Sequence, residues 1–171
     1  MQKSELIHEI KNISIFKKFG EDFFEAFIPH LKINDYSEGH HIITEGDAGR
    51  DMYLLLEGNV RVVKKTLSGD KYTAAVLKAE MGIFFGEVGL LTEEKRTASI
   101  IGETKIKLAS IDAVSFQKFI TEYPLFGAQL LFEIGASVCG RLNKANKDTI
   151  ILYEALMGEI STTNLGVNLA T

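Results

Sequence analysis

The chain has 171 residues, of which 46% are hydrophobic and 25% are charged, and its net charge is −4. This length and composition suit one folded domain with an appendage, and they exclude a disordered chain. The negative balance argues against a protein that coats nucleic acid, and we expect no nucleic-acid partner.

The cysteine content and the N-terminus bear on the compartment. Cys139 is the single cysteine, so a disulfide framework is excluded and we expect a reducing, cytoplasmic location. The first residues are amphipathic and charged, without the apolar core of a signal peptide. No apolar run reaches the ~18 residues that a membrane span needs, so we expect no association with a membrane.

Residues 1–30 read as a helical segment. Residues 3–11 place aliphatic side chains at helical spacing, and a second helix is predicted over about residues 21–28, up to Pro29.

From Leu31 onwards the hydrophobic period changes from 3.6 to 2, and glycines separate short apolar runs. Eight strands are predicted, near residues 31–36, 41–44, 52–57, 59–66, 71–78, 83–85, 96–101 and 105–111. We therefore expect an α+β fold, in which residues 31–112 form an eight-stranded antiparallel β-roll of the jelly-roll kind, with helices on both sides of it in the sequence.

The C-terminal part returns to helical spacing. Asp112 is a plausible N-cap for a helix over residues 113–122. A long helix is predicted from Leu125 to about Met157, with Gly158 as the candidate for its end. Residues 113–158 would then be two helices, and residues 159–171 a tail.

The long helix has an apolar face with two interpretations. A helix of ~30 residues is about 45 Å long, which is more than one small domain can cover. The face either packs on the roll alone or pairs with a second copy, and we favour a homodimer through residues 125–157. The residues near this face are Leu130, Ile134, Val138, Leu142 and Ala145.

The stretch from Phe84 to Ile100 holds the candidate site. It contains Glu87 and Arg96, with a predicted helical turn at residues 86–91 and a strand that Arg96 is expected to open. Gly86 lets the backbone approach a ligand closely, a helix start offers free N–H donors, and a guanidinium can bind phosphate with two hydrogen bonds. The pair could equally be a plain salt bridge. As a site, it suits a small ligand that carries hydroxyls and a phosphate.

The stretch FGEVGLLTEEKRTASI resembles the phosphate-binding cassette of the cyclic nucleotide-binding domain family. The upstream residues Gly39, Ile42, Glu45-Gly46-Asp47, Gly49 and Met52-Tyr53 resemble the strand-turn pattern of that family, so the resemblance covers about residues 15–157. Two positions depart from the commonest pattern. Lys95 stands where proline is frequent, and Thr97 stands where alanine is frequent, as in members that respond to cyclic GMP or to both nucleotides.

The resemblance implies cyclic AMP or cyclic GMP as the ligand, with no further cofactor. Arg96 would pair with the cyclic phosphate and Glu87 would accept from the ribose 2′-hydroxyl. The remaining contacts to phosphate and ribose would come from Gly86, Val88, Thr97 and Ala98, and the base would pack on Leu77 and Phe85.

A sensor, and not an enzyme, is the function that we expect, because no second acid–base pair, nucleophile triad or metal set accompanies the site. Too few residues follow Gly158 for a DNA-reading helix-turn-helix. We therefore expect either a free-standing module that acts through an unknown downstream protein or a domain of a longer protein. One alternative is a domain that has lost its ligand and serves only for dimerisation. Another is a metal protein of the cupin type, which His40 and His41 before Glu45 suggest. A cupin needs two histidines on one strand face, however, and adjacent residues on a strand point to opposite faces.

Overall fold

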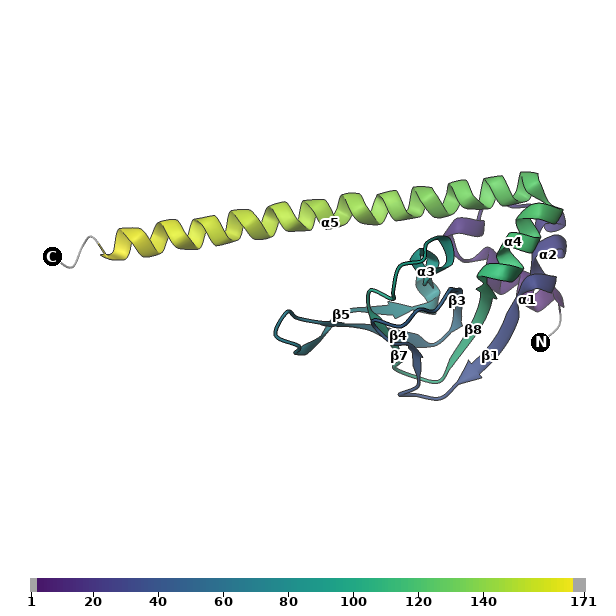
Figure 1. Cartoon of the computed structure of the whole chain (residues 1–171), viewed down its shortest axis with the longest axis horizontal. Helices are drawn as coiled ribbons and strands as arrows, with labels where there is room; N and C mark the ends of the chain where they lie inside the picture. The colour runs from purple at the N-terminus through teal and green to yellow at the C-terminus, as the bar shows by residue number, and fades with distance from the viewer. Residues whose placement is uncertain (1–2, 168–171) are drawn as a thin grey trace. The chain divides into compact units, whose positions relative to one another are not determined.

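The computed structural model describes the backbone of residues 3–167 and the side chains of residues 3–158. It divides into two compact units, residues 1–131 and residues 132–171, which are described separately. The first unit holds every strand and all helices but the long one, which begins in it (Figure 1). The strands are β1 (Lys32–Tyr36), β2 (His41–Ile43), β3 (Asp51–Glu57), β4 (Asn59–Lys65), β5 (Lys71–Lys78), β6 (Phe84–Phe85), β7 (Ser99–Gly102) and β8 (Ile106–Asp112).

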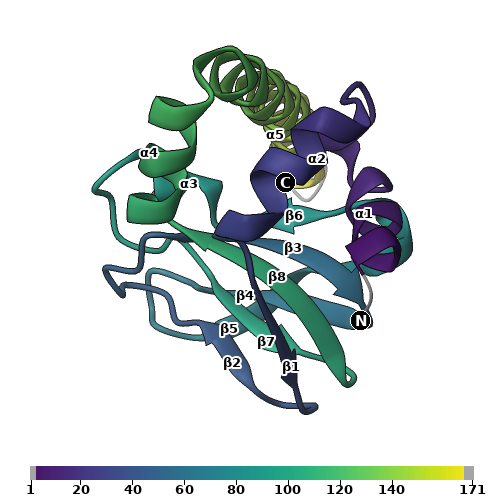
Figure 2. The ribbon, with the colours of Figure 1, turned by 90° about the vertical axis from the view of Figure 1, so that its right-hand side faces the viewer.

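These strands form two four-stranded sheets, with the orders β1-β8-β3-β6 and β2-β7-β4-β5. All pairs are antiparallel, and Figure 2 shows the strands curving around a common interior. The predicted eight-stranded antiparallel β-roll is therefore confirmed. Its interior is filled by alternating strand residues, namely Ile43, Leu55, Val60, Phe85, Ile100, Ile106 and Leu108, as period-2 patterning requires.

Helices precede, interrupt and follow the roll. They are α1 (Lys3–Lys11), η1 (Ser14–Phe16), α2 (Glu21–Phe27), η2 (Ile28–His30), η3 (Ala79–Met81), α3 (Glu87–Leu91), α4 (Ala113–Glu122) and α5 (Pro124–Val167). Phenylalanines join α2 to α4, because the ring centroids of Phe23 and Phe27 on α2 lie 5.8 and 5.0 Å from that of Phe119 on α4. All three rings are at most 1% exposed, so this aromatic cluster is a second core beside the roll.

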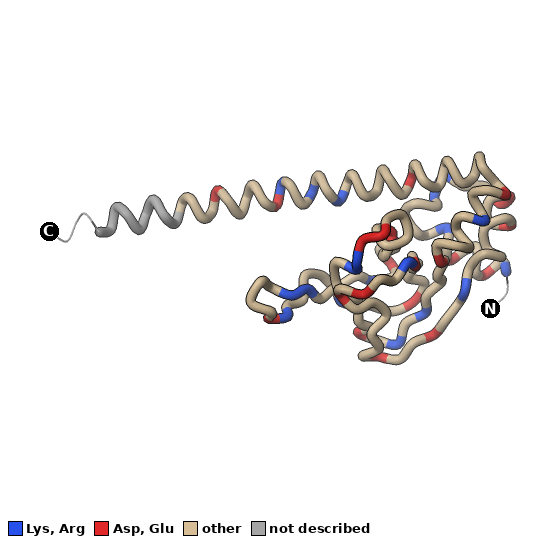
Figure 3. The backbone as a smooth tube through the Cα atoms, in the orientation of Figure 1, with Lys and Arg blue, Asp and Glu red and all other residues tan. Residues whose placement is uncertain are grey.

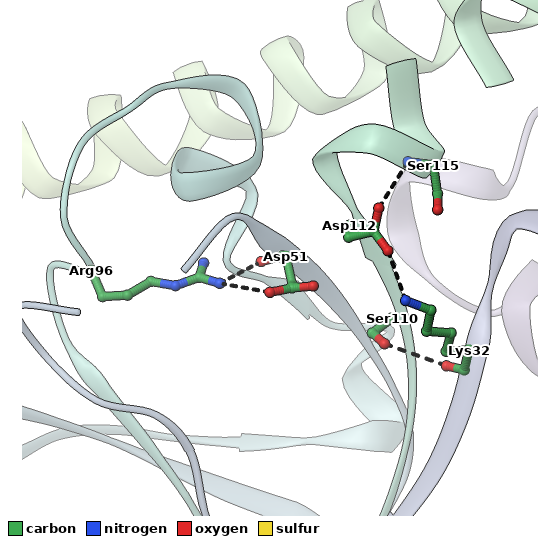
Figure 4. Close-up of polar contacts among 6 residues, drawn as sticks. All are labelled: Lys32, Asp51, Arg96, Ser110, Asp112 and Ser115. Atoms are coloured by element: carbon green, nitrogen blue, oxygen red, sulfur yellow. Dashed lines mark hydrogen bonds and ion pairs between the residues drawn. The ribbon is translucent and has the colours of Figure 1, made fainter. Parts of the chain in front are cut away.

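The junction between β8 and α4 follows the sequence signal. Asp112 caps α4 by accepting a hydrogen bond from the backbone N–H of Ser115 at 2.8 Å, as an N-cap residue does. Its other carboxylate oxygen accepts from Lys32 on β1 at 2.8 Å. The cap thus ties the start of α4 to the edge of the sheet (Figure 4).

The long helix α5 differs from expectation in two respects. It continues past Gly158 to Val167, so the prediction that Gly158 ends it was wrong; a glycine costs a helix only about 1 kcal/mol relative to alanine. By length and composition, its stretch Pro124–Gly158 could also cross a membrane, with a mean hydropathy of 1.2 in an 18-residue window. The expectation that no stretch is long and apolar enough was therefore wrong as well. The same properties suit a helix that pairs with another helix.

Candidate functional site

Arg96 lies in the loop between α3 and β7, with its backbone paired to the turn that follows β2. Its N–H donates to the carbonyl of Asp47, and its carbonyl accepts from the N–H of Gly46, both at 2.8 Å. The prediction that Arg96 opens a strand was wrong, since β7 begins at Ser99. Both backbone groups of Arg96 are bonded to a turn and not to a neighbouring strand, which fixes the root of its side chain.

The guanidinium of Arg96 is buried and bonded to backbone carbonyls. The residue is 7% exposed; its Nη1 donates to the carbonyl of Gly86 at 3.0 Å, and its Nη2 donates to the carbonyl of Asp51 at 2.9 Å. The carboxylate of Asp51 lies 3.9 Å from Nη2, as Figure 4 shows. These contacts hold the guanidinium between the start of β3 and the start of α3.

Three glycines enclose this guanidinium. A β-carbon on Gly49 would lie 2.9 Å from Nε, one on Gly86 would lie 3.0 Å from Nη1, and one on Gly89 would lie 2.7 Å from Nη1. Such distances are too short for a side chain. Gly86 also has φ +84°, a backbone conformation that glycine adopts without strain. The glycines leave just enough room for a planar cation.

The other residues predicted to contact the phosphate and ribose lie in and near α3 and next to Arg96 in the sequence. Glu87 is the first residue of α3 and is only 6% exposed. Val88 follows it on the surface at 39% exposed, while Thr97 is exposed and Ala98 half-buried. The carbonyl of Gly86 accepts a hydrogen bond from Arg96. The buried carboxylate of Glu87 and the buried guanidinium of Arg96 therefore lie at the same end of α3.

The two residues predicted to pack a base belong to the interior of the roll. Leu77 on β5 pairs in register with Val60 on β4 and packs, half-buried, against the core. Phe85 on β6 is 5% exposed, and its ring stacks on Tyr53 at 5.5 Å. Leu77 is the more accessible of the two, whereas the ring of Phe85 is largely occupied by core packing.

Electrostatics at the site extend to Tyr53. Burial raises the pKa of the Tyr53 hydroxyl to about 12, and the nearby carboxylate of Asp51 acts in the same direction, against a smaller opposing effect of Arg96. A hydroxyl with this pKa is neutral throughout the physiological range. Tyr53 is therefore a polar but uncharged neighbour of the Arg96 contacts.

Asp51 and the roles of Gly49 and Gly89 are what reasoning from sequence missed. The motif contains both glycines, but nothing in the spacing shows that they pack on Arg96. Asp51 had one usable signal, its place directly before the buried residue that begins the apolar run of β3.

The histidines weighed as metal ligands lie elsewhere in the roll. His40 stacks on Tyr36 with ring centroids 4.7 Å apart, and the side chain of His41 is exposed. Among residues 3–158, no group of three or more His, Cys, Asp or Glu side chains could hold a metal ion.

Comparisons with known proteins bear on the family and the fold of the chain. The cyclic nucleotide-binding domain family matches residues 33–123. The mouse potassium/sodium hyperpolarization-activated cyclic nucleotide-gated channel 2 is 31% identical over 153 residues, which are 90% of this chain and 16% of the channel. The chain thus spans about a sixth of that relative's length.

Two solved structures show the same fold. The catabolite activator protein of Thermus thermophilus is 25% identical with a TM-score of 0.72, over 81% of this chain and 62% of that one. The cAMP-bound PfPKA-R is 28% identical with a TM-score of 0.59, over 68% of this chain and 41% of that one. With the family match covering more than half of its residues, the chain belongs to the cyclic nucleotide-binding domain family.

Proposed function

We propose that this chain is a sensor domain that binds cyclic AMP or cyclic GMP at the Arg96 loop. The observation that carries the proposal is the burial of a full positive charge in a cage of glycines. Arg96 is 7% exposed, its two hydrogen bonds to Gly86 and Asp51 go to neutral carbonyls, and the Asp51 carboxylate stands at 3.9 Å. A buried cation is costly unless it is well paired, and a bound phosphate would supply hydrogen-bonded pairing.

Each predicted residue has a role in this proposal. Arg96 binds the cyclic phosphate, Glu87 accepts from the ribose 2′-hydroxyl, and Leu77 packs the base with Phe85 beneath. The backbone from Gly86 to Val88 and at Thr97 and Ala98 lines the phosphate and ribose. The role of Glu87 is supported by its burial at the first position of α3.

A continuous set of contacts connects the site to the helices that follow the roll. Gly49 and Asp51 contact the guanidinium, and the backbone carbonyl of Arg50 between them accepts a hydrogen bond from the N–H of Ala113 at 3.0 Å. Ala113 is the first residue of α4. We propose that the ligand shifts the position of residues 49–51 and so re-packs α4. It can do so only by its difference in affinity for the two arrangements.

The long helix α5 is proposed to join two copies of the chain. Its described part from Cys139 onwards is exposed on every side, although it carries large apolar side chains such as Leu142 (59% exposed), Leu152 (65%) and Leu156 (59%). Figure 3 shows charged residues of both signs at intervals along it, separated by uncharged stretches. Of the face expected from the sequence, Leu130 and Ile134 are fully buried, so the proposed seam begins only at Leu142. From there the residues at steps of three and four, the spacing of a helix pair, are Leu142, Ala145, Thr149, Leu152 and Leu156. A cytoplasmic location and a downstream protein partner complete the proposal.

Isothermal titration calorimetry with cyclic AMP and cyclic GMP tests the central claim. We expect a saturable heat of binding for at least one of the two nucleotides, and none for 5′-AMP, whose phosphate is not cyclic. Heats at the level of dilution for both cyclic nucleotides would refute the sensor and favour the dimerisation module. Stoichiometric metal in the purified protein, by elemental analysis, would favour the cupin-type alternative.

A further inference from the structure

We propose that Asp51 sets the affinity of the site, by competing with the bound anion for Arg96. This inference rests on the proposed function, because it concerns the regulation of the same site. Asp51 meets Arg96 in two ways: its carbonyl accepts a hydrogen bond from Nη2 at 2.9 Å, and its carboxylate Oδ2 lies 3.9 Å from the same nitrogen. The first contact positions the guanidinium, and the second places a negative charge beside it.

The two partners differ in their freedom to move. The Arg96 side chain is 6% exposed, whereas the Asp51 side chain is 40% exposed. Arg96 is fixed by backbone bonds to Gly46 and Asp47 and by the walls of Gly49 and Gly89. An arriving phosphate therefore finds the cation in place, and the carboxylate is the group that has to turn away into water.

The distance shows that this carboxylate is not needed to hold Arg96. At 3.9 Å it is an ion pair without a hydrogen bond, whereas the backbone carbonyls of Asp51 and Gly86 make the hydrogen bonds. The charge of Asp51 partly cancels that of Arg96 and would repel an anion bound to the same guanidinium. Removing that charge and keeping the backbone should raise the affinity for the nucleotide.

The test is Asp51→Asn, which keeps the size of the side chain and the backbone carbonyl. In calorimetry at low salt, we expect the variant to bind cyclic nucleotide about 3- to 10-fold more tightly than the wild type, the range of one partly exposed charge. The gain should shrink in 0.5 M salt, because an exposed carboxylate is screened. The matched control is Asp47→Asn, which neutralises an exposed side chain of the turn between β2 and β3 and keeps the backbone carbonyl that bonds to Arg96; we expect a change below about 2-fold.

The outcomes separate this inference from the proposed function. Tighter binding by Asp51→Asn alone supports it. Unchanged or weaker binding, with the wild type still binding, overturns it and leaves the sensor standing; weaker binding would mean that the carboxylate orients Arg96. An equal gain in Asp47→Asn would also overturn it, because the gain would then come from the general change in charge. Failure of both wild type and Asp51→Asn to bind would overturn the sensor and this inference together.

Discussion

Gly89 lies so close to the guanidinium of Arg96 that a β-carbon on it would come within 2.7 Å of Nη1. A β-carbon on Gly49 would likewise lie 2.9 Å from Nε of Arg96. Gly49 and Gly89 are not among the described glycines with a positive φ. Those glycines are Gly39, Gly46, Gly58, Gly69, Gly82 and Gly86. These two positions therefore require glycine for space and not for backbone freedom. Two glycines of the motif, Gly49 and Gly89, therefore leave the space that the guanidinium of Arg96 occupies.

Replacing Gly89 by alanine should disturb both the fold and the site. The new methyl group would lie 2.6 Å from the carbonyl of Gly49 as well as 2.7 Å from Nη1, so α3 or the turn has to shift. We expect a loss of about 1–3 kcal/mol in the free energy of unfolding, measured by urea denaturation, together with weaker nucleotide binding. Gly140→Ala is the control, since Gly140 is also helical and a β-carbon on it would meet no heavy atom within 4 Å. It should be neutral or stabilising by up to about 1 kcal/mol.

Arg96→Ala should remove most of the binding. The loss of a buried charge partner of a phosphate costs ~2–5 kcal/mol, which calorimetry resolves. Arg50→Ala is the control, because Arg50 is an exposed arginine in the turn that contacts Arg96. Since Arg96→Ala also leaves two carbonyls unpaired, circular dichroism must show a folded variant. Arg96→Lys, which keeps the charge and loses the planar fork, should bind with intermediate affinity. Equal affinity in Arg96→Ala and wild type would disprove the site.

Glu87→Gln should weaken binding less than Arg96→Ala does. The substitution keeps the shape of the side chain and removes a charge-assisted hydrogen bond, worth on the order of 1 kcal/mol when it is replaced by a neutral one. A cycle with the 2′-deoxy cyclic nucleotide identifies the partner. If Glu87 accepts from the 2′-hydroxyl, the variant and the wild type should bind the deoxy ligand almost equally. If Glu87→Gln weakens binding of the deoxy ligand as much as it weakens binding of the normal ligand, Glu87 has another role.

The sequence predicts the β-roll well because local patterns determine its strands. Glycine turns and period-2 alternation locate all eight strands, and Asp112 indicates the start of α4. The environment of Arg96 was not predictable in the same way, because it depends on contacts between segments far apart in the chain. Asp51 and Gly86 meet the guanidinium only after β3 and β6 have paired. The end of α5 was missed because a glycine is a weak helix stop when the residues on both sides continue the helix.

The N-cap Asp112 should give a stability contribution that depends on pH. Hydrogen bonds from Lys32 and from the Ser115 backbone lower the pKa of its carboxyl from 3.8 to about 2. A lowered pKa stabilises the fold above about pH 4 and loses that contribution as the pH falls toward 2. At pH 7, Asp112→Ala should cost about 1–2 kcal/mol by removing the cap, and Asp112→Asn, which can still cap, should cost less.

Urea unfolding between pH 7 and pH 3 measures this dependence. The difference between wild type and Asp112→Asn should shrink as the pH falls, because protonation removes the charge that the variant already lacks. Lys32→Met is the control for the ion pair and should remove part of the same pH dependence. A difference that stays constant over the whole range would contradict the assignment.

Self-association of α5 can be tested with two adjacent residues of similar exposure. Leu152 (65% exposed) lies on the stripe with Leu142 and Leu156, whereas Ile151 (62% exposed) is turned about 180° from Leu142 at 100° per residue. If the stripe is the seam of a homodimer, Leu152→Lys should place a charge in it and shift the protein to monomer, while Ile151→Lys should leave the dimer intact. Sedimentation velocity over a range of concentrations distinguishes the two masses. A wild type that stays monomeric would rule out the dimer, and equal disruption by both substitutions would place the contact on a different or a wider face of the helix.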